Sequence, residues 1–148
     1  MMVLVDSTIW SLALRRRSHQ LSVPEQELVA EWIELVSSGR AVLTGPIRQE
    51  ILSGIRTEEA FEALRGKLSS FRYLEVLPGD YDQAARFFNL CRSQGVAGTH
   101  VDMLLCATAH RYSVPIFTTD QDFLHYARCL PVGLHTEKGA RSFLERDA

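Results

Sequence analysis

Short apolar runs alternate with longer segments of helical periodicity along the chain, and this alternation restricts the fold more than any other feature. The apolar runs lie at residues 2–5, 41–43, 73–77, 115–118 and 132–134. The first run, which is short, continuous and β-branched at two positions, is typical of a strand that is buried on both faces. Strands that alternate with helices predict an α/β fold, a sandwich in which helices cover both faces of a mostly parallel central sheet.

The segments between these runs carry the spacing and the end signals of helices. Ser22, Pro24 and Glu25 predict a capping box at the start of the second helix. No repeat, low-complexity segment or linker divides the 148 residues, so we expect a single domain over residues 1–148. The expected helices lie within residues 7–15, 22–39, 45–54, 57–68, 78–95, 99–112 and 122–127.

The composition argues against a membrane protein and against a disulfide framework. No apolar run approaches the about 20 residues that span a bilayer, and we find no signal peptide pattern. Three widely spaced cysteines, Cys91, Cys106 and Cys129, favour free thiols in a reducing compartment. We therefore expect a cytoplasmic protein without membrane association.

Acidic residues follow the predicted strands at the end where parallel sheets bind ligands. Asp6 directly follows the first strand, and Asp120 follows the strand at residues 115–118. Glu50 and Asp102 lie among apolar residues on helices that should be buried. Buried carboxylates that lie close together repel each other unless a cation neutralises them. Ligands that are all oxygen favour a hard cation, Mg²⁺ or Mn²⁺.

Such a site suits phosphodiester hydrolysis, because a bound cation polarises a phosphoryl oxygen and activates water. Neighbouring hydroxyl groups are placed to hydrogen-bond the ligating carboxylates or a metal-bound water: Ser7, Thr8, Thr118 and Thr119. Each residue taken alone has a simpler interpretation, since Asp caps helices and Ser or Thr stabilises turns. The convergence of four acids at one edge favours the metal site.

Three consecutive arginines, Arg15, Arg16 and Arg17, stand out in a chain with a net charge of −2. Guanidinium groups bind nucleic-acid phosphates through paired hydrogen bonds. A solvated helix end that complements the helix dipole explains the same triplet equally well. The apolar side chains before the triplet either form an exposed partner or RNA surface or belong to the core: Trp10, Leu12 and Leu14.

These motifs together resemble the PIN-domain ribonucleases, and within them the VapC-type toxins of bacterial toxin–antitoxin pairs. The matching stretches are V-L-V-D-S-T at residues 3–8, E-I-L-S-G at 50–54, and T-T-D-Q-D-F at 118–123. An Asp at the head of an Ala-containing helix, Asp102, completes the pattern. Ser113 stands where a Gly often precedes the last core strand, and Thr8 where Ser or Asn is common.

The resemblance implies a PIN-like three-layer α/β/α sandwich and a Mg²⁺-dependent endoribonuclease that cleaves single-stranded or looped RNA. It implies an acidic site of Asp6, Glu50, Asp102 and Asp120, with Asp122 as a fifth member and a metal ligand beside Asp6, Asp102 and Asp120. It also implies a homodimer and a cognate VapB-like antitoxin. The alternative is a non-catalytic PIN-like module that binds RNA or protein, although a pure binder gains nothing from clustered carboxylates.

Overall fold

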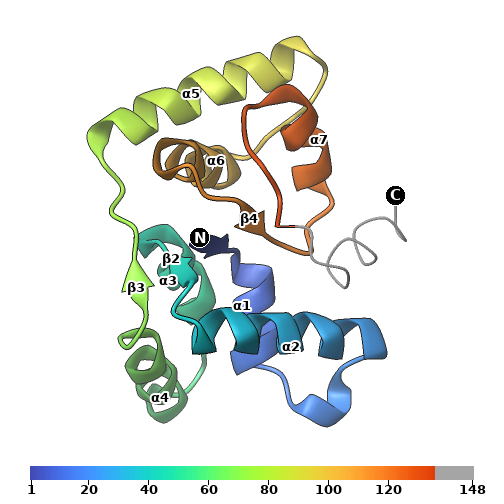
Figure 1. Ribbon diagram of the computed structural model, residues 1–148. Coiled ribbons are helices and arrows are strands. Elements are labelled where there is room, and N and C mark those ends of the chain that lie inside the picture. The colour runs from blue at the N-terminus through green and yellow to red at the C-terminus, as the bar shows by residue number, and fades with distance from the viewer. Residues whose placement is uncertain (136–148) are drawn as a thin grey trace.

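A parallel β-sheet lies between two layers of helices in the computed structural model, which describes residues 1–135 (Figure 1). Within these residues the sheet has four strands, in the order β3-β2-β1-β4, and every pair is parallel. The predicted α/β sandwich with a parallel sheet is thereby confirmed. The prediction of one domain over residues 1–148 includes residues 136–148, which lie outside the described residues. The strands are β1 (Val3–Val5), β2 (Ala41–Leu43), β3 (Arg72–Tyr73) and β4 (Ile116–Phe117).

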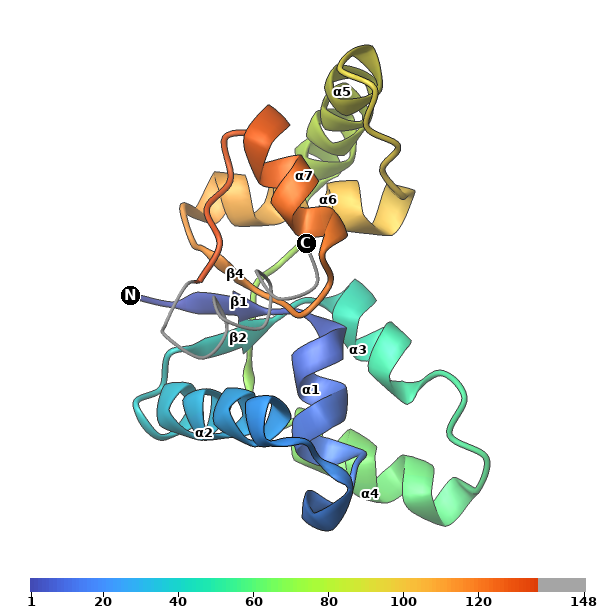
Figure 2. The ribbon, with the colours of Figure 1, turned by 90° about the vertical axis from the view of Figure 1, so that its right-hand side faces the viewer.

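Helices cover both faces of the sheet, as Figure 2 shows, with α5, α6 and α7 on one side and α1, α2 and α4 on the other. None of the helices in residues 1–135 is long and apolar enough to cross a bilayer. The helices are α1 (Ser7–Leu14), α2 (Val23–Ser37), α3 (Gly45–Leu52), α4 (Glu58–Leu68), α5 (Pro78–Ser93), α6 (His100–Tyr112) and α7 (Asp122–Cys129), with a 3₁₀ turn at Ser18–Gln20.

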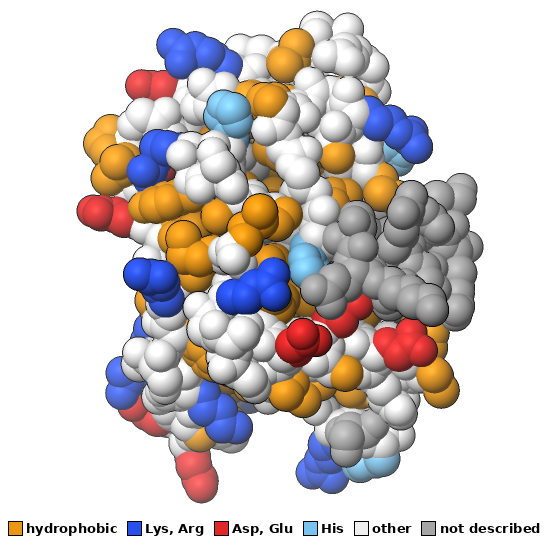
Figure 3. All heavy atoms as spheres, viewed as in Figure 1, with side chains coloured by type: hydrophobic (Ala, Val, Ile, Leu, Met, Phe, Trp, Pro, Cys, Tyr) orange, Lys and Arg blue, Asp and Glu red, His pale blue; other side chains and the backbone are white. Residues whose placement is uncertain are grey.

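The carboxyl and amino ends of the strands lie at opposite edges of the sheet, and the two edges have different surroundings. At the carboxyl ends of the strands, on the right in Figure 2, the helices α1, α3 and α6 begin. The opposite edge faces the viewer in Figure 1, and Figure 3 shows that hydrophobic side chains gather around the middle of that face. Met1 and Pro115 line a hollow there. The predicted acids belong to the other edge, where helix N-termini favour negative charge.

The apolar side chains before the arginine triplet belong to the core. Trp10 is fully buried, its indole N–H donates to the carbonyl of Val5 at 2.9 Å, and its ring packs edge-on against Phe71. Leu12 is 7 % exposed, and Leu14 is half-buried against the same core. The hypothesis of an exposed partner surface here is wrong, because α1 lies under α2 and turns these side chains inward.

Helix ends follow the predicted polar signals. Ser22 and Glu25 form the reciprocal capping box at the start of α2, with hydrogen bonds of 3.3 and 3.0 Å. Threonine side chains cap α3, α4 and α6. Ser113 ends α6 with a φ of 54°, in the left-handed region that favours glycine. A glycine would adopt that conformation without the strain that a side chain introduces.

Three strand predictions were too long. The strand expected at residues 115–118 covers only Ile116–Phe117. The strand expected at residues 73–77 covers only Arg72–Tyr73, because after Leu74 the chain leaves the sheet to reach α5. The strand expected at residues 132–134 is reduced, within residues 1–135, to a single bridge between Leu134 and Ile116. Pro131, which has no N–H to donate, precedes that segment.

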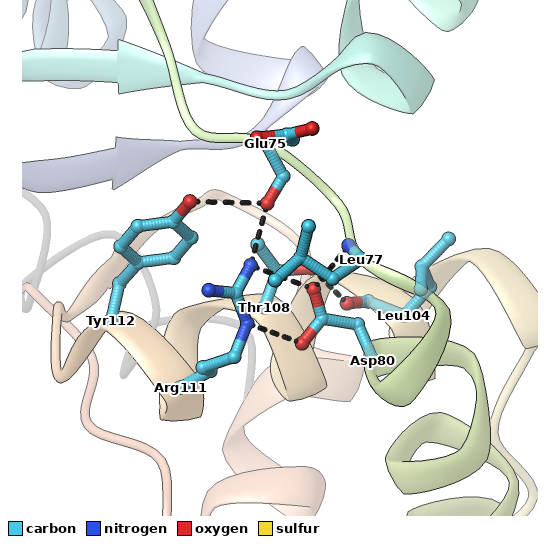
Figure 4. A network of polar contacts seen from close by, with 7 residues as sticks. All are labelled: Glu75, Leu77, Asp80, Leu104, Thr108, Arg111 and Tyr112. Atoms are coloured by element: carbon cyan, nitrogen blue, oxygen red, sulfur yellow. Dashed lines mark hydrogen bonds and ion pairs between the residues drawn. The ribbon is translucent and has the colours of Figure 1, made fainter.

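An ion pair between the buried carboxylate of Asp80 and the partly exposed guanidinium of Arg111 ties α6 to the start of α5, as Figure 4 shows. The guanidinium of Arg111 donates to both carboxylate oxygens of Asp80, at 2.7 and 2.9 Å, and to the carbonyl of Glu75 at 2.6 Å. The Asp80 side chain is 2 % exposed and also accepts the Leu77 N–H at 2.8 Å. The hydrogen bonds from Arg111 hold the pKa of Asp80 below its usual range.

Replacing Arg111 by Met should lower the free energy of unfolding by about 2–3 kcal/mol, because Asp80 is left as a buried carboxylate without its cation. Urea unfolding at pH 7 measures this. Arg65→Met is the matched control, since the Arg65–Glu62 pair is exposed and should contribute little. The pKa of Asp80 is lowered on folding, so its contribution is present above the unfolded pKa and disappears as the pH falls through the folded pKa. An equal decrease in stability in the two variants at pH 7 would contradict the prediction.

Candidate metal centre

The carboxylate of Asp6 is buried at the end of β1, where it is 6 % exposed. It makes no capping hydrogen bond to α1, so the simpler interpretation of this residue as a helix cap does not hold. It accepts hydrogen bonds from the hydroxyls of Thr118 at 2.7 Å and Thr8 at 3.2 Å. Burial raises the pKa of Asp6 to about 6, with a smaller upward contribution from the charge of Glu50, while the hydrogen bond from Thr118 opposes the rise.

Two threonine hydroxyls join the end of β1 to the loop after β4. The Thr118 hydroxyl donates to Asp6 and accepts the N–H of Asp120 at 3.0 Å. The Thr8 hydroxyl also donates to Asp6, and it accepts the N–H of Thr119 at 3.2 Å. Both hydroxyls therefore hold the first acid and fix the loop that carries the second.

Asp102 lies half-buried in the first turn of α6. Thr99 caps this helix by accepting the N–H of Asp102 at 3.1 Å, and the Tyr126 hydroxyl donates to Asp102 Oδ2 at 2.9 Å. Burial raises the pKa of Asp102, the hydrogen bonds from Tyr126 and Thr99 lower it, and the charges of Asp120 and Glu50 raise it further. Burial and the Asp102 charge raise the pKa of Tyr126, so its phenol stays a donor.

Asp102, Asp120 and Asp122 each bring a carboxylate oxygen within 4.8 Å of the other two. Asp120 also stabilises the turn into α7, because its Oδ1 accepts the Asp122 N–H at 2.9 Å. Opposite ligands of Mg²⁺ lie about 4.2 Å apart, so the spread of the three oxygens is close to that of a cation's ligand shell. Oxygen donors of this kind, with no nitrogen or sulfur among them, fit Mg²⁺ or Mn²⁺.

Glu50 was expected to be buried, and it is exposed. The short helix α3 buries Ile47 and Ile51 instead, which leaves Glu50 at the open rim. It nevertheless lines the same narrow cleft as Asp6 and Asp102, and its charge raises the pKa of both carboxyls. The cleft therefore brings together acids from β1, α3 and α6.

Two residues near the acids differ from what the sequence indicates. Ser7 is buried, and within residues 1–135 no hydrogen bond joins its hydroxyl to an acid of the site. Tyr126 was missed, although its position four residues after Asp122 puts both on one face of α7. The spacing predicts that Tyr126 and Asp122 share a face of α7. It does not predict that Tyr126 contacts Asp102 on α6, because that contact depends on tertiary packing.

A second hollow adjoins the acidic cleft on the side of α1. Glu50 lines both hollows and lies between them. Arg15 and Arg16 line the second hollow, and Arg16 also forms an ion pair with the Glu25 carboxylate at 3.4 Å. Arg17 is exposed and does not line this hollow. The hollow is lined by Ser7, Thr8, Ser11, Leu12, Arg15, Arg16, Glu25, Glu50 and Thr119.

Solved structures of similar fold come from several bacteria. VapBC2 from Rickettsia felis, bound to a DNA fragment from its promoter, matches with a TM-score of 0.71 and 12% identity over 93% of this chain and 100% of that one. A toxin–antitoxin complex from Klebsiella pneumoniae gives 0.61 and 16% over 82% and 89%. VapC20 from Mycobacterium tuberculosis, a sarcin-ricin loop cleaving toxin, gives 0.62 and 17% over 88% and 98%.

No curated protein sequence matches this chain significantly. The family model described as PIN domain matches residues 3–128, which include the whole sheet and all five acids of the predicted site. This chain therefore belongs to the PIN domain family.

Proposed function

We propose that this protein is a Mg²⁺- or Mn²⁺-dependent endoribonuclease of the cytoplasm, and the toxin of a type II toxin–antitoxin pair. The observation that carries the proposal is the group of three carboxylate oxygens within 4.8 Å of one another, from Asp102, Asp120 and Asp122. Within residues 1–135 none of these acids forms a salt bridge with a basic side chain. Their uncompensated charge favours a bound cation.

The acids are proposed to have two roles. Asp102, Asp120 and Asp122 would hold the cation, together with Asp6, whose buried carboxylate is joined to the Asp120 backbone through Thr118. A divalent cation bound there polarises a phosphoryl oxygen and lowers the pKa of a coordinated water. Glu50 is exposed at the rim, where water reaches it, and is the acid placed to accept a proton.

Cleavage of defined RNAs tests the proposal. We expect purified protein to cut single-stranded or looped RNA in Mg²⁺ or Mn²⁺, to leave duplex RNA largely intact, and to stop in EDTA. Mapping the cut sites on total cellular RNA then identifies the substrate. Binding without cleavage, across both metals and several RNAs, would instead support the non-catalytic alternative.

The acidic cleft and the side chains beside it support two proposed partners, an antitoxin and a second copy of this chain. Solved structures of this fold include a toxin–antitoxin complex, and a basic side chain of a VapB-like antitoxin would complement the acidic cleft. Exposed hydrophobic side chains beside the cleft support a homodimer: Leu77 is 38% exposed, Tyr81 57% and Val101 50%. Tyr81 and Val101 line one hollow between α5 and α6.

Arg15 and Arg16 are proposed to bind RNA phosphates next to the cleavage position. Replacing both by Ala should raise the Michaelis constant for RNA and leave kcat nearly unchanged. The slope of log affinity against log salt concentration should become shallower by about 0.7 for each single-strand phosphate that the variant no longer binds. The matched control is Arg65→Ala with Arg92→Ala, which removes the same charge from other helices. An equal effect in both double variants would show that only net charge matters.

A further inference from the structure

Tyr126 joins the two helices that carry the cation-binding acids. Asp102 lies in the first turn of α6, whereas Asp122 and Tyr126 lie on α7. The only side-chain hydrogen bond between α6 and α7 in the part of the chain that the structure describes runs from the Tyr126 hydroxyl to Asp102 Oδ2, at 2.9 Å. It thus sets the position of Asp102 relative to the head of α7.

The donor is rigid. The Tyr126 side chain is 1 % exposed, and its ring packs edge-on against Phe123, with 5.1 Å between the ring centroids. A buried aromatic side chain has only two rotatable bonds, and packing fixes both here. The hydroxyl is therefore held in place before any cation arrives, and it donates to Oδ2 of Asp102.

We propose that Tyr126 is a positioning residue for the metal site, an inference that rests on the function proposed above. Three acids that approach within 4.8 Å repel one another, so an acid without a fixed donor would swing away from the others. The hydroxyl offsets part of that repulsion and orients the carboxylate for binding. Removing such a hydrogen bond to a metal ligand typically weakens metal affinity about 10- to 100-fold.

The test compares Tyr126→Phe with the wild type by calorimetric titration of the metal-free chain with Mn²⁺. We expect the dissociation constant for Mn²⁺ to rise about 10-fold or more. The Mn²⁺ concentration that half-activates RNA cleavage should rise in parallel, while the rate at saturating Mn²⁺ stays close to that of the wild type. If Tyr126 acted only on folding, the substitution would not raise the half-activating Mn²⁺ concentration while leaving the rate at saturating Mn²⁺ unchanged.

Tyr112→Phe is the matched control. It removes a hydroxyl from the far end of α6, where that group donates to the carbonyl of Glu75 at 3.1 Å, away from the acids. Its Mn²⁺ affinity should equal that of the wild type. Tyr126→Met, which lacks the donor but fills the core, is the second test if Tyr126→Phe does not fold.

The outcomes separate the two proposals. Suppose that the wild type binds Mn²⁺ and cleaves RNA, and that a folded Tyr126→Phe or Tyr126→Met variant has the same Mn²⁺ affinity. This result would overturn the positioning role of Tyr126 and leave the nuclease proposal standing. A wild-type chain that neither binds Mn²⁺ nor cleaves RNA would overturn both. Weaker Mn²⁺ binding in Tyr126→Phe alone, with Tyr112→Phe unchanged, supports the positioning role.

Discussion

Asp102→Asn is expected to reduce metal-dependent RNA cleavage by at least about 1,000-fold, equivalent to about 4 kcal/mol of transition-state stabilisation. The substitution keeps the size of the side chain and removes the charge that a cation needs. The amide oxygen of Asn can still accept the hydrogen bond that Tyr126 donates to Asp102. Burial raises the pKa of Asp102, so a neutral side chain should not destabilise the fold.

Asp82→Asn is the control for this substitution. Asp82 is an exposed acid on α5, and the same chemical change there should leave cleavage intact. Rates of RNA cleavage in Mg²⁺, together with the thermal unfolding of each variant, give the comparison. Unchanged cleavage by a folded Asp102→Asn variant would remove Asp102 from the metal site.

Asp6→Asn is expected to abolish cleavage and yet make the metal-free protein more stable at pH 7. Burial raises the pKa of Asp6 from 3.8 to about 6. Because the folded pKa lies above the unfolded pKa, the contribution of this group to stability is fully present below about pH 4 and disappears as the pH rises through about 6. At pH 7 the charged carboxylate therefore destabilises the metal-free fold by up to about 2–3 kcal/mol.

An asparagine carries no charge and still accepts the hydroxyl hydrogen bonds that hold Asp6. Thermal unfolding in EDTA should therefore show a melting temperature for Asp6→Asn several degrees above that of the wild type at pH 7. The difference should shrink at pH 4, where the wild-type carboxyl is protonated. A lower melting temperature for Asp6→Asn at pH 7 would show instead that the charged carboxylate stabilises the fold.

The sequence predicted the features that depend on local pattern. The apolar strands at residues 3–5 and 41–43 were recognised because each is short and buried on both faces. The position of Asp6 and Asp120 after two strands, and of Asp102 at the head of an apolar helix, follows from the same pattern. Parallel neighbours in a sheet place such acids at one edge, as β1 and β4 do.

The features that the sequence did not predict depend on contacts between distant segments. Glu50 was expected to be buried because its neighbours are apolar, but a helix as short as α3 can bury Ile47 and Ile51 and still leave the acid at the rim. The sequence left open whether Trp10 is exposed on a partner surface or belongs to the core. The packing of α1 against α2 shows that it belongs to the core. The bond from Tyr126 to Asp102 spans 24 residues, beyond the reach of local pattern.

We propose that the acids at the carboxyl edge of the sheet form a binding site for divalent cations on which RNA cleavage depends. Titration of the metal-free protein with Mn²⁺, followed by calorimetry, tests it most directly when the same preparation is assayed for RNA cleavage. We predict saturable Mn²⁺ binding to the wild type, cleavage that rises with occupancy, and neither binding nor cleavage in Asp102→Asn. RNA cleavage that persists in EDTA, by a protein that binds no Mn²⁺, would show that the acids do not form a metal site on which cleavage depends.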